Sequence, residues 1–177
     1  MNTKTFKLVL LAVVTLLGIF TQAFSQEAPW LTDYSKAVQQ AKSENKPILL
    51  DFTGSDWCGW CIKMKEETLD KPAFRHYAEK NLVLVEVDFP HDKVQTDAVK
   101  TQNGQLGGQF KITGYPSFVL LDKDGKELGR QVGYLKGGPS AFIAWLNTSY
   151  KPASSDTGAT DDNDAFFKQA AQSRSRP

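Results

Sequence analysis

The sequence contains few soft metal ligands, with two cysteines and two histidines among its 177 residues. A structural zinc site normally takes four such ligands, usually supplied by paired motifs. Both cysteines, Cys58 and Cys61, lie in one short segment without a second CxxC motif, and only His76 and His91 remain as further candidates. This shortage disfavours a zinc site, and we predict neither a metal nor a bound cofactor.

The sequence also lacks a hydrophobic run of the roughly 20 residues that span a bilayer. Its longest apolar run, residues 8–20, follows Lys4 and Lys7 and is followed by small residues. This order is typical of an export signal peptide. We therefore expect residues 1–25 to be cleaved, leaving a mature chain that begins at Gln26 in the periplasm or outside the cell. A retained membrane anchor is the alternative.

Charge of either sign is not in excess. The chain has 21 basic and 20 acidic residues, and loss of the two leader lysines would leave 19 basic residues. Basic and acidic side chains are interspersed, as at Lys63, Lys65, Glu66 and Glu67. Because surfaces that bind nucleic acid concentrate positive charge, we predict no nucleic-acid partner.

The last segment, residues 153–177, has little apolar content and is rich in Ser, Asp, Ala and Gln. Such a segment cannot offset the entropy cost of ordering by burial. We predict a disordered tail there and one folded domain over residues 26–152. The short stretch before residue 46 leaves no room for a dimerisation module, so we expect a monomer.

The feature that stands out against these shortages is the sequence WCGWC at residues 57–61, directly after the apolar run at 47–52. If Cys58 begins a helix, its sulfur lies at the positive end of the helix dipole, which stabilises a thiolate. Thiolates attack disulfides, so the pair suits thiol-disulfide exchange. A structural disulfide and buried unreactive thiols are the alternatives, although so short a ring restricts the unfolded chain little.

Hydrophobic periodicity predicts an α/β domain. Helices are expected after Thr32 and Asp33, which can cap a helix start, and at residues 58–69, 73–80, 92–100 and 139–146. Strands are expected at residues 48–53, 82–88, 117–121 and 127–132, with a glycine-rich loop at 103–108. The last two strands should form an antiparallel hairpin. These elements imply a mixed central sheet with helices on both faces.

Three segments in order resemble the thioredoxin superfamily over residues 46–147. KPILLDF with WCGWC resembles the family's first core strand and active-site turn. KITGYPSFVLL resembles its substrate loop and the next strand, and VGYLK resembles the glycine-bearing loop that flanks the site. The resemblance implies a thioredoxin fold and a thiol-disulfide oxidoreductase.

The resemblance also implies a role for each site residue. Cys58 would be the attacking thiolate, and Cys61 would resolve the mixed disulfide. Pro116 would be a cis proline that faces the two sulfurs and positions the substrate. The backbone of Tyr115 would pair with the substrate. Asp51 would be the buried acid that assists proton transfer at the resolving cysteine.

The chain departs from the family pattern near this acid. The turn at residues 53–56 is one residue longer than in ordinary thioredoxins, and the lysine that partners the acid is expected to be replaced by an apolar residue near Leu84. A solvated Asp51 at the strand end, and an ordinary trans Pro116 that starts a strand, are the alternatives to these two roles.

The aromatic residues Trp57, Trp60 and Tyr115 are predicted to surround the sulfurs with apolar surface suited to flexible protein segments. For Trp57, packing beneath the turn is an equal alternative. Trp60 supplies no charge that would stabilise the Cys58 thiolate, which favours a reductant or mild exchanger over a strong oxidant.

Two hypotheses follow from the sequence. The first is an exported enzyme that reduces or exchanges protein disulfides and is recharged by a membrane thiol donor. The second is a non-catalytic module that binds client proteins on a thioredoxin fold.

Overall fold

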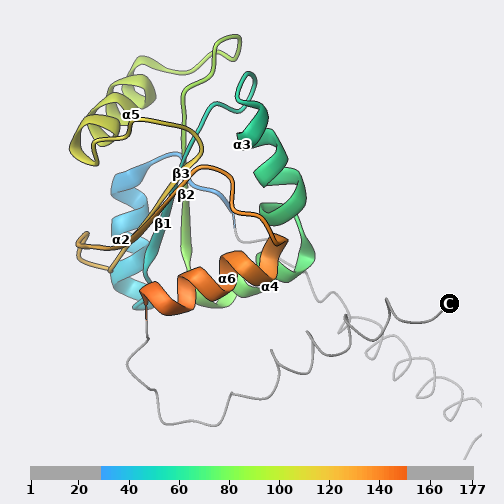
Figure 1. Cartoon of the computed structure of the whole chain (residues 1–177). Coiled ribbons are helices and arrows are strands. Elements are labelled where there is room, and N and C mark those ends of the chain that lie inside the picture. Colours follow the sequence, from blue (N-terminus) through green and yellow to red (C-terminus); the bar gives the residue numbers. More distant parts are fainter. Residues whose placement is uncertain (1–28, 151–177) are drawn as a thin grey trace, which may run out of the picture.

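The computed structural model describes residues 29–150 (Figure 1). They make up most of the domain predicted over residues 26–152. The signal peptide predicted at 1–25 and the tail predicted at 153–177 lie outside the described residues. Between residues 29 and 150, no helix has the length and apolar character needed to cross a membrane.

Four strands form one mixed sheet in the order β2-β1-β3-β4. β1 runs parallel to β2, whereas β3 is antiparallel to both β1 and β4. The strands span Ile48–Thr53 (β1), Val83–Asp88 (β2), Ser117–Leu121 (β3) and Glu127–Val132 (β4). The predicted bounds of β1, β3 and β4 are confirmed, because apolar runs and the turn between β3 and β4 mark them in the sequence.

Helices cover both faces of the sheet, as predicted. They are α2 (Tyr34–Glu44), α3 (Gly59–Met64), the π-helical turn η1 (Lys65–Leu69), α4 (Pro72–Asn81), α5 (Asp97–Gln109) and α6 (Gly138–Ser149). In Figure 1, α2 and α5 lie on one side of the sheet, and α3, α4 and α6 lie on the other. The helix predicted over residues 58–69 is continuous but widens to a π-helix at Lys65.

The alternation of side chains along β1 divides the core between these two faces. Ile48, Leu50 and Phe52 pack in the cluster that includes α2 and α5. Leu49 packs in the other cluster, with residues of α3, α4 and α6. Asp51 follows Leu49 at a spacing of two, so its carboxyl group lies on the α3 side of the sheet.

The prediction for the region of α5 is wrong. We expected a helix over residues 92–100 and a glycine-rich loop at 103–108, but the helix begins at Asp97 and continues to Gln109. Its start is set by Thr96, whose hydroxyl accepts from the Val99 N–H. Burial of Leu106 and a bond from the buried Asn103 Nδ2 to the carbonyl of Asp88 (2.8 Å) offset the low helix propensity of the glycines.

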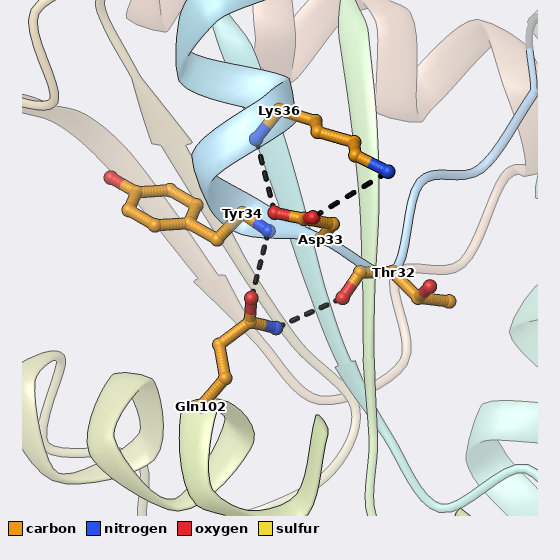
Figure 2. A network of polar contacts seen from close by, with 5 residues as sticks. All are labelled: Thr32, Asp33, Tyr34, Lys36 and Gln102. Atoms are coloured by element: carbon orange, nitrogen blue, oxygen red, sulfur yellow. Dashed lines mark hydrogen bonds and ion pairs between the residues drawn. The ribbon is translucent and has the colours of Figure 1, made fainter. Parts of the chain in front are cut away.

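The start of α2 is fastened to α5 by one side chain (Figure 2). Gln102 accepts from the Tyr34 N–H and donates from Nε2 to the Thr32 carbonyl, both at 2.9 Å. Asp33 caps α2 as predicted, since its carboxylate accepts from the Lys36 N–H at 3.1 Å. The two helices on this face therefore hold each other in place.

Candidate active site

The two cysteines lie at the start of α3, which follows β1, and they form a disulfide with a Cα–Cα distance of 5.2 Å. Cys58 is the N-cap residue of α3, and its sulfur accepts from the Cys61 N–H at 3.2 Å. Both residues are buried, with Cys58 at 7% exposure and Cys61 at 3%. An amide that points at the Cys58 sulfur stabilises negative charge there, which favours Cys58 as the attacking thiolate.

The turn before the cysteines is held by Asp56, whose carboxylate accepts from three consecutive backbone amides. The donors are the N–H groups of His91 (3.0 Å), Asp92 (2.8 Å) and Lys93 (3.2 Å). These bonds, led by that of His91, hold the pKa of Asp56 below its usual range. The turn at residues 53–56 thus anchors the loop that follows β2.

A second connection joins the same two loops. Ser55 donates to the Asp88 carboxylate from its N–H (2.9 Å) and its hydroxyl (2.6 Å), and Lys93 Nζ donates to the Ser55 hydroxyl (2.7 Å). Sequence analysis missed these roles because the partners lie more than 30 residues apart. The sequence signal for these roles was the turn at residues 53–56, in which Ser55 and Asp56 carry side-chain oxygens that can accept hydrogen bonds.

Trp57 is both packed against its neighbours and accessible to solvent. Its ring stacks on His91 with centroids 4.8 Å apart and meets the edge of Tyr115 at 5.6 Å. Its Nε1 donates to the Phe89 carbonyl at 2.7 Å, yet 41% of the residue is exposed. A Cβ at Gly54 would lie 2.4 Å from the Trp57 ring, so this glycine makes room for it.

Trp60 is exposed beside the cysteines, at 58%. Its ring lies 5.5 Å from that of Tyr134, and Lys63 Nζ lies over both rings at 5.5 and 5.2 Å. The Tyr134 hydroxyl donates to Glu67. Tyr134 was not predicted as a site residue, although its loop was recognised as one that flanks the site.

Pro116 lies directly before β3. The Tyr115–Pro116 peptide bond is cis, as the resemblance implies, and Pro116 is buried at the start of β3. Its carbonyl accepts from the Gly133 N–H at 2.8 Å. The half-buried ring of Tyr115 contacts Trp57 and Phe89, and burial raises the pKa of its hydroxyl.

Asp51 lies in β1 beneath the cysteines and is buried, at 7% exposure. Its Oδ1 atom has no hydrogen-bond partner. Burial raises the pKa of Asp51 to about 8, the charge of Glu86 adds to this rise, and the charge of Lys65 opposes it. Asp51 is therefore a buried acid and not the solvated strand-end residue of the alternative reading.

A cleft of about 200 Å³ connects this acid with Cys61. Asp51, Cys61, Lys65 and Glu86 are among the residues that line it. Glu86 is the β2 neighbour of Asp51 in the parallel register. An apolar residue near Leu84 was expected in place of the lysine of ordinary thioredoxins, and Leu84 is an apolar, buried residue of β2. The positive charge that acts on Asp51 comes instead from Lys65 in η1.

The geometry is that of a redox-active cysteine pair above a buried acid. Comparison with known proteins supports the fold and the redox-active pair. A family model described as a thioredoxin-like domain matches residues 34–149. The chain belongs to the thioredoxin-like family. Within residues 29–150, the structure has no group of three or more metal-ligating side chains.

Several members of this thioredoxin-like family are similar over most of the domain. Disulfide bond reductase DsbH of Chlamydia pneumoniae is 42% identical over 118 residues, which cover 67% of this chain and 70% of that protein. Thioredoxin-related protein DsbJ of the same organism is 35% identical over 60% of this chain but only 30% of its own length. A solved structure of a DsbH oxidoreductase has 38% identity and a TM-score of 0.65, covering 73% of this chain and 91% of that one.

Proposed function

We propose that this chain is an exported thiol-disulfide oxidoreductase that reduces protein disulfides. The observation that carries the proposal is the Cys58–Cys61 pair, with the Cys58 sulfur as the helix cap above the buried Asp51. The likeness to a disulfide bond reductase over 70% of that protein's length supports the direction of the reaction.

The reaction begins with the reduced enzyme. The Cys58 thiolate attacks one sulfur of a substrate disulfide, a mixed disulfide forms, and the other substrate sulfur leaves as a thiolate. Cys61 then loses its proton, which Asp51 accepts, and attacks the Cys58 sulfur. The Cys58–Cys61 disulfide forms and the second substrate thiol is released, so two electrons pass from the enzyme to the substrate.

The substrate surface consists of Trp57, Trp60, Tyr115 and Pro116, around the cysteines. The exposed rings of Trp57 and Trp60 suit extended segments of unfolded or flexible proteins. Trp60 brings no positive charge next to Cys58, so the reduced form has no special stabilisation of the kind a strong oxidant needs. Outside the cytoplasm the enzyme must be recharged, and a membrane thiol donor is the partner that this requires.

Trapping of the mixed disulfide tests the proposal. Cys61→Ser should accumulate covalent adducts with cell-envelope proteins that dithiothreitol releases, whereas Cys58→Ser should form none, because only Cys58 attacks. Reduction of insulin should fall by at least about 10³-fold in both variants. Absence of adducts with Cys61→Ser would contradict the mechanism.

The reduction potential tests the direction of the reaction. Equilibration of the full chain with glutathione should give a value close to that of thioredoxin, roughly −270 mV. A value of about −180 to −120 mV would instead indicate an isomerase or oxidant. Protection of unfolded clients by a variant that lacks both cysteines would favour the client-binding hypothesis, since the exposed aromatic surface remains in that variant.

A further inference from the structure

The cleft beside Cys61 holds an unusual pair of acids. Asp51 on β1 and Glu86 on β2 are register neighbours in parallel strands, so their side chains leave the sheet on the same face. Both line the cleft with Cys61. Asp51 is more than nine-tenths buried, and its Oδ1 has no partner there. The cleft thus holds a buried acid, Asp51, that has an unpaired oxygen and lies close to the sulfur of Cys61.

Other charged groups approach this pair from several elements. They are Asp88 at the end of β2, Lys65 and Glu66 in η1, Asp70 after η1, and Lys93 in the loop that follows β2. Most of them are engaged elsewhere or exposed. The Asp88 carboxylate accepts from Ser55, and Lys65 Nζ lies 3.5 Å from the Asp70 carboxylate. The charges with the largest effect on Asp51 are that of Glu86, its register neighbour, and that of Lys65, which acts although it is also paired with Asp70.

We propose that Glu86 is a positioning residue for proton transfer at Cys61: its negative charge beside Asp51 adds to the effect of burial and helps to hold the proton on Asp51 in the oxidised enzyme, and Lys65 opposes this effect. The proposal rests on the proposed function, because it assigns Glu86 a part in the same disulfide exchange. Burial places Glu86 where its charge is poorly screened, and it also raises the pKa of Glu86 itself.

A protonated Asp51 serves the recharging half of the cycle. A donor thiolate attacks the Cys58 sulfur, the Cys58–Cys61 bond breaks, and its electron pair goes to the Cys61 sulfur. That sulfur takes the proton of Asp51, and a second thiolate of the donor then releases Cys58 from the mixed disulfide. Asp51 is left ionised in the reduced enzyme, where it can accept the Cys61 proton during the next attack on a substrate. Since Glu86 keeps this proton in place, it favours reduction of the enzyme by its donor.

The direct test is the titration of the Asp51 carboxyl group by carbon-13 NMR on the oxidised full chain, in which neither cysteine titrates. Glu86→Gln should lower the titration midpoint of Asp51 by about one pH unit, and Lys65→Met should raise it. Glu66→Gln is the matched control, because it removes the same charge from an exposed residue of the same cleft and should move the midpoint little. An unchanged midpoint in Glu86→Gln, or shifts of one sign in both test variants, would overturn the proposal.

The rate of reduction by dithiothreitol provides the functional readout. At pH 8, a midpoint lower by about one unit cuts the protonated fraction of Asp51 about fivefold, and the rate of Glu86→Gln relative to wild type should fall accordingly. The relative rate should return to one near pH 5, where Asp51 is protonated in both proteins, which a merely structural defect would not do. If wild type fails to reduce insulin while the NMR shift persists, the proposed function fails. If insulin is reduced and the midpoint does not move, only the role of Glu86 fails.

Discussion

The two flanks of the cysteine turn are built in opposite ways. On the flank of the loop after β2, the polar groups of Ser55, Asp56 and Trp57 are joined to partners by hydrogen bonds of 2.6 to 3.2 Å. On the cleft flank, a buried oxygen of Asp51 has none. A buried polar group without a partner costs free energy. The hydrogen bonds of the first flank therefore stabilise the folded protein, whereas the unpaired oxygen of the second flank destabilises it.

This difference separates two tasks of one turn. The flank formed by Ser55, Asp56 and Trp57, called the fastened flank below, fixes where the cysteines and the aromatic surface lie. This task needs rigidity. The cleft flank keeps an acid whose proton is available near neutral pH, which needs a site that does not stabilise the charged form. Matched substitutions on the two flanks should therefore have effects of opposite sign on the free energy of unfolding.

The largest effect is expected from Asp51→Asn, which should stabilise the oxidised protein by about 3 kcal/mol at pH 7. The pKa of Asp51 is about 8 in the folded chain against 3.8 as its ordinary value. The unfolded chain therefore loses this proton first, and wild type loses stability as pH rises from about 4 to 8. At pH 7 this amounts to roughly 4 kcal/mol, of which the unpaired buried amide of the variant cancels about 1 kcal/mol.

Urea unfolding at pH 5, 7 and 8.5 measures this effect. The difference between Asp51→Asn and wild type should grow with pH over this range and level off above about pH 8. A variant that is less stable than wild type at pH 7 would show that the carboxyl group is well accommodated, and the contrast between the flanks would collapse.

The same chemical change on the fastened flank, Asp56→Asn, should lower the melting temperature by several degrees. One amide oxygen cannot replace a carboxylate that accepts from His91, Asp92 and Lys93. The pKa of Asp56 is lowered from 3.8 in the folded chain, so its contribution is complete above that value and is lost as pH falls through the lowered pKa.

Thermal melts at pH 7 and pH 3 check the sign of this prediction. The difference between Asp56→Asn and wild type should shrink at the lower pH. Hydrogen exchange should show faster exchange of the amides at residues 91–93 in the variant. Unchanged exchange at these amides would mean that the Asp56 bonds do not hold the loop.

The two flanks also differ in how far the sequence predicts them. The cysteines, the cis Pro116 and the strand that carries Asp51 follow from local patterns and the family resemblance. The partners on the fastened flank do not, because Asp56 bonds to amides more than 30 residues away. Glu86 was missed because the register of β2 against β1 cannot be read from either strand alone, and a shift of two residues keeps the same face inward.

The tail of α5 was mispredicted for a related reason. Local propensity argues against a helix through Gly104, Gly107 and Gly108, and the bond from Asn103 to Asp88 that supports it is a contact between distant segments. The sequence therefore predicts the redox chemistry better than the surroundings that tune it.

The smallest effect should come from Trp57→Phe, which keeps an aromatic ring on the substrate surface but loses the Nε1 bond to the Phe89 carbonyl. Loss of this one hydrogen bond should destabilise the protein by about 1 kcal/mol in urea unfolding. Trp60→Phe is the matched control, since Trp60 is 58% exposed and its replacement should change stability by less than about 0.5 kcal/mol. If the two variants lose equal stability, Trp57 belongs to the substrate surface alone, and the fastened flank ends at Asp56. If only Trp57→Phe is destabilised, Trp57 both belongs to the fastened flank and presents its exposed edge to the substrate. This double role would explain how a rigid turn holds an apolar surface in place.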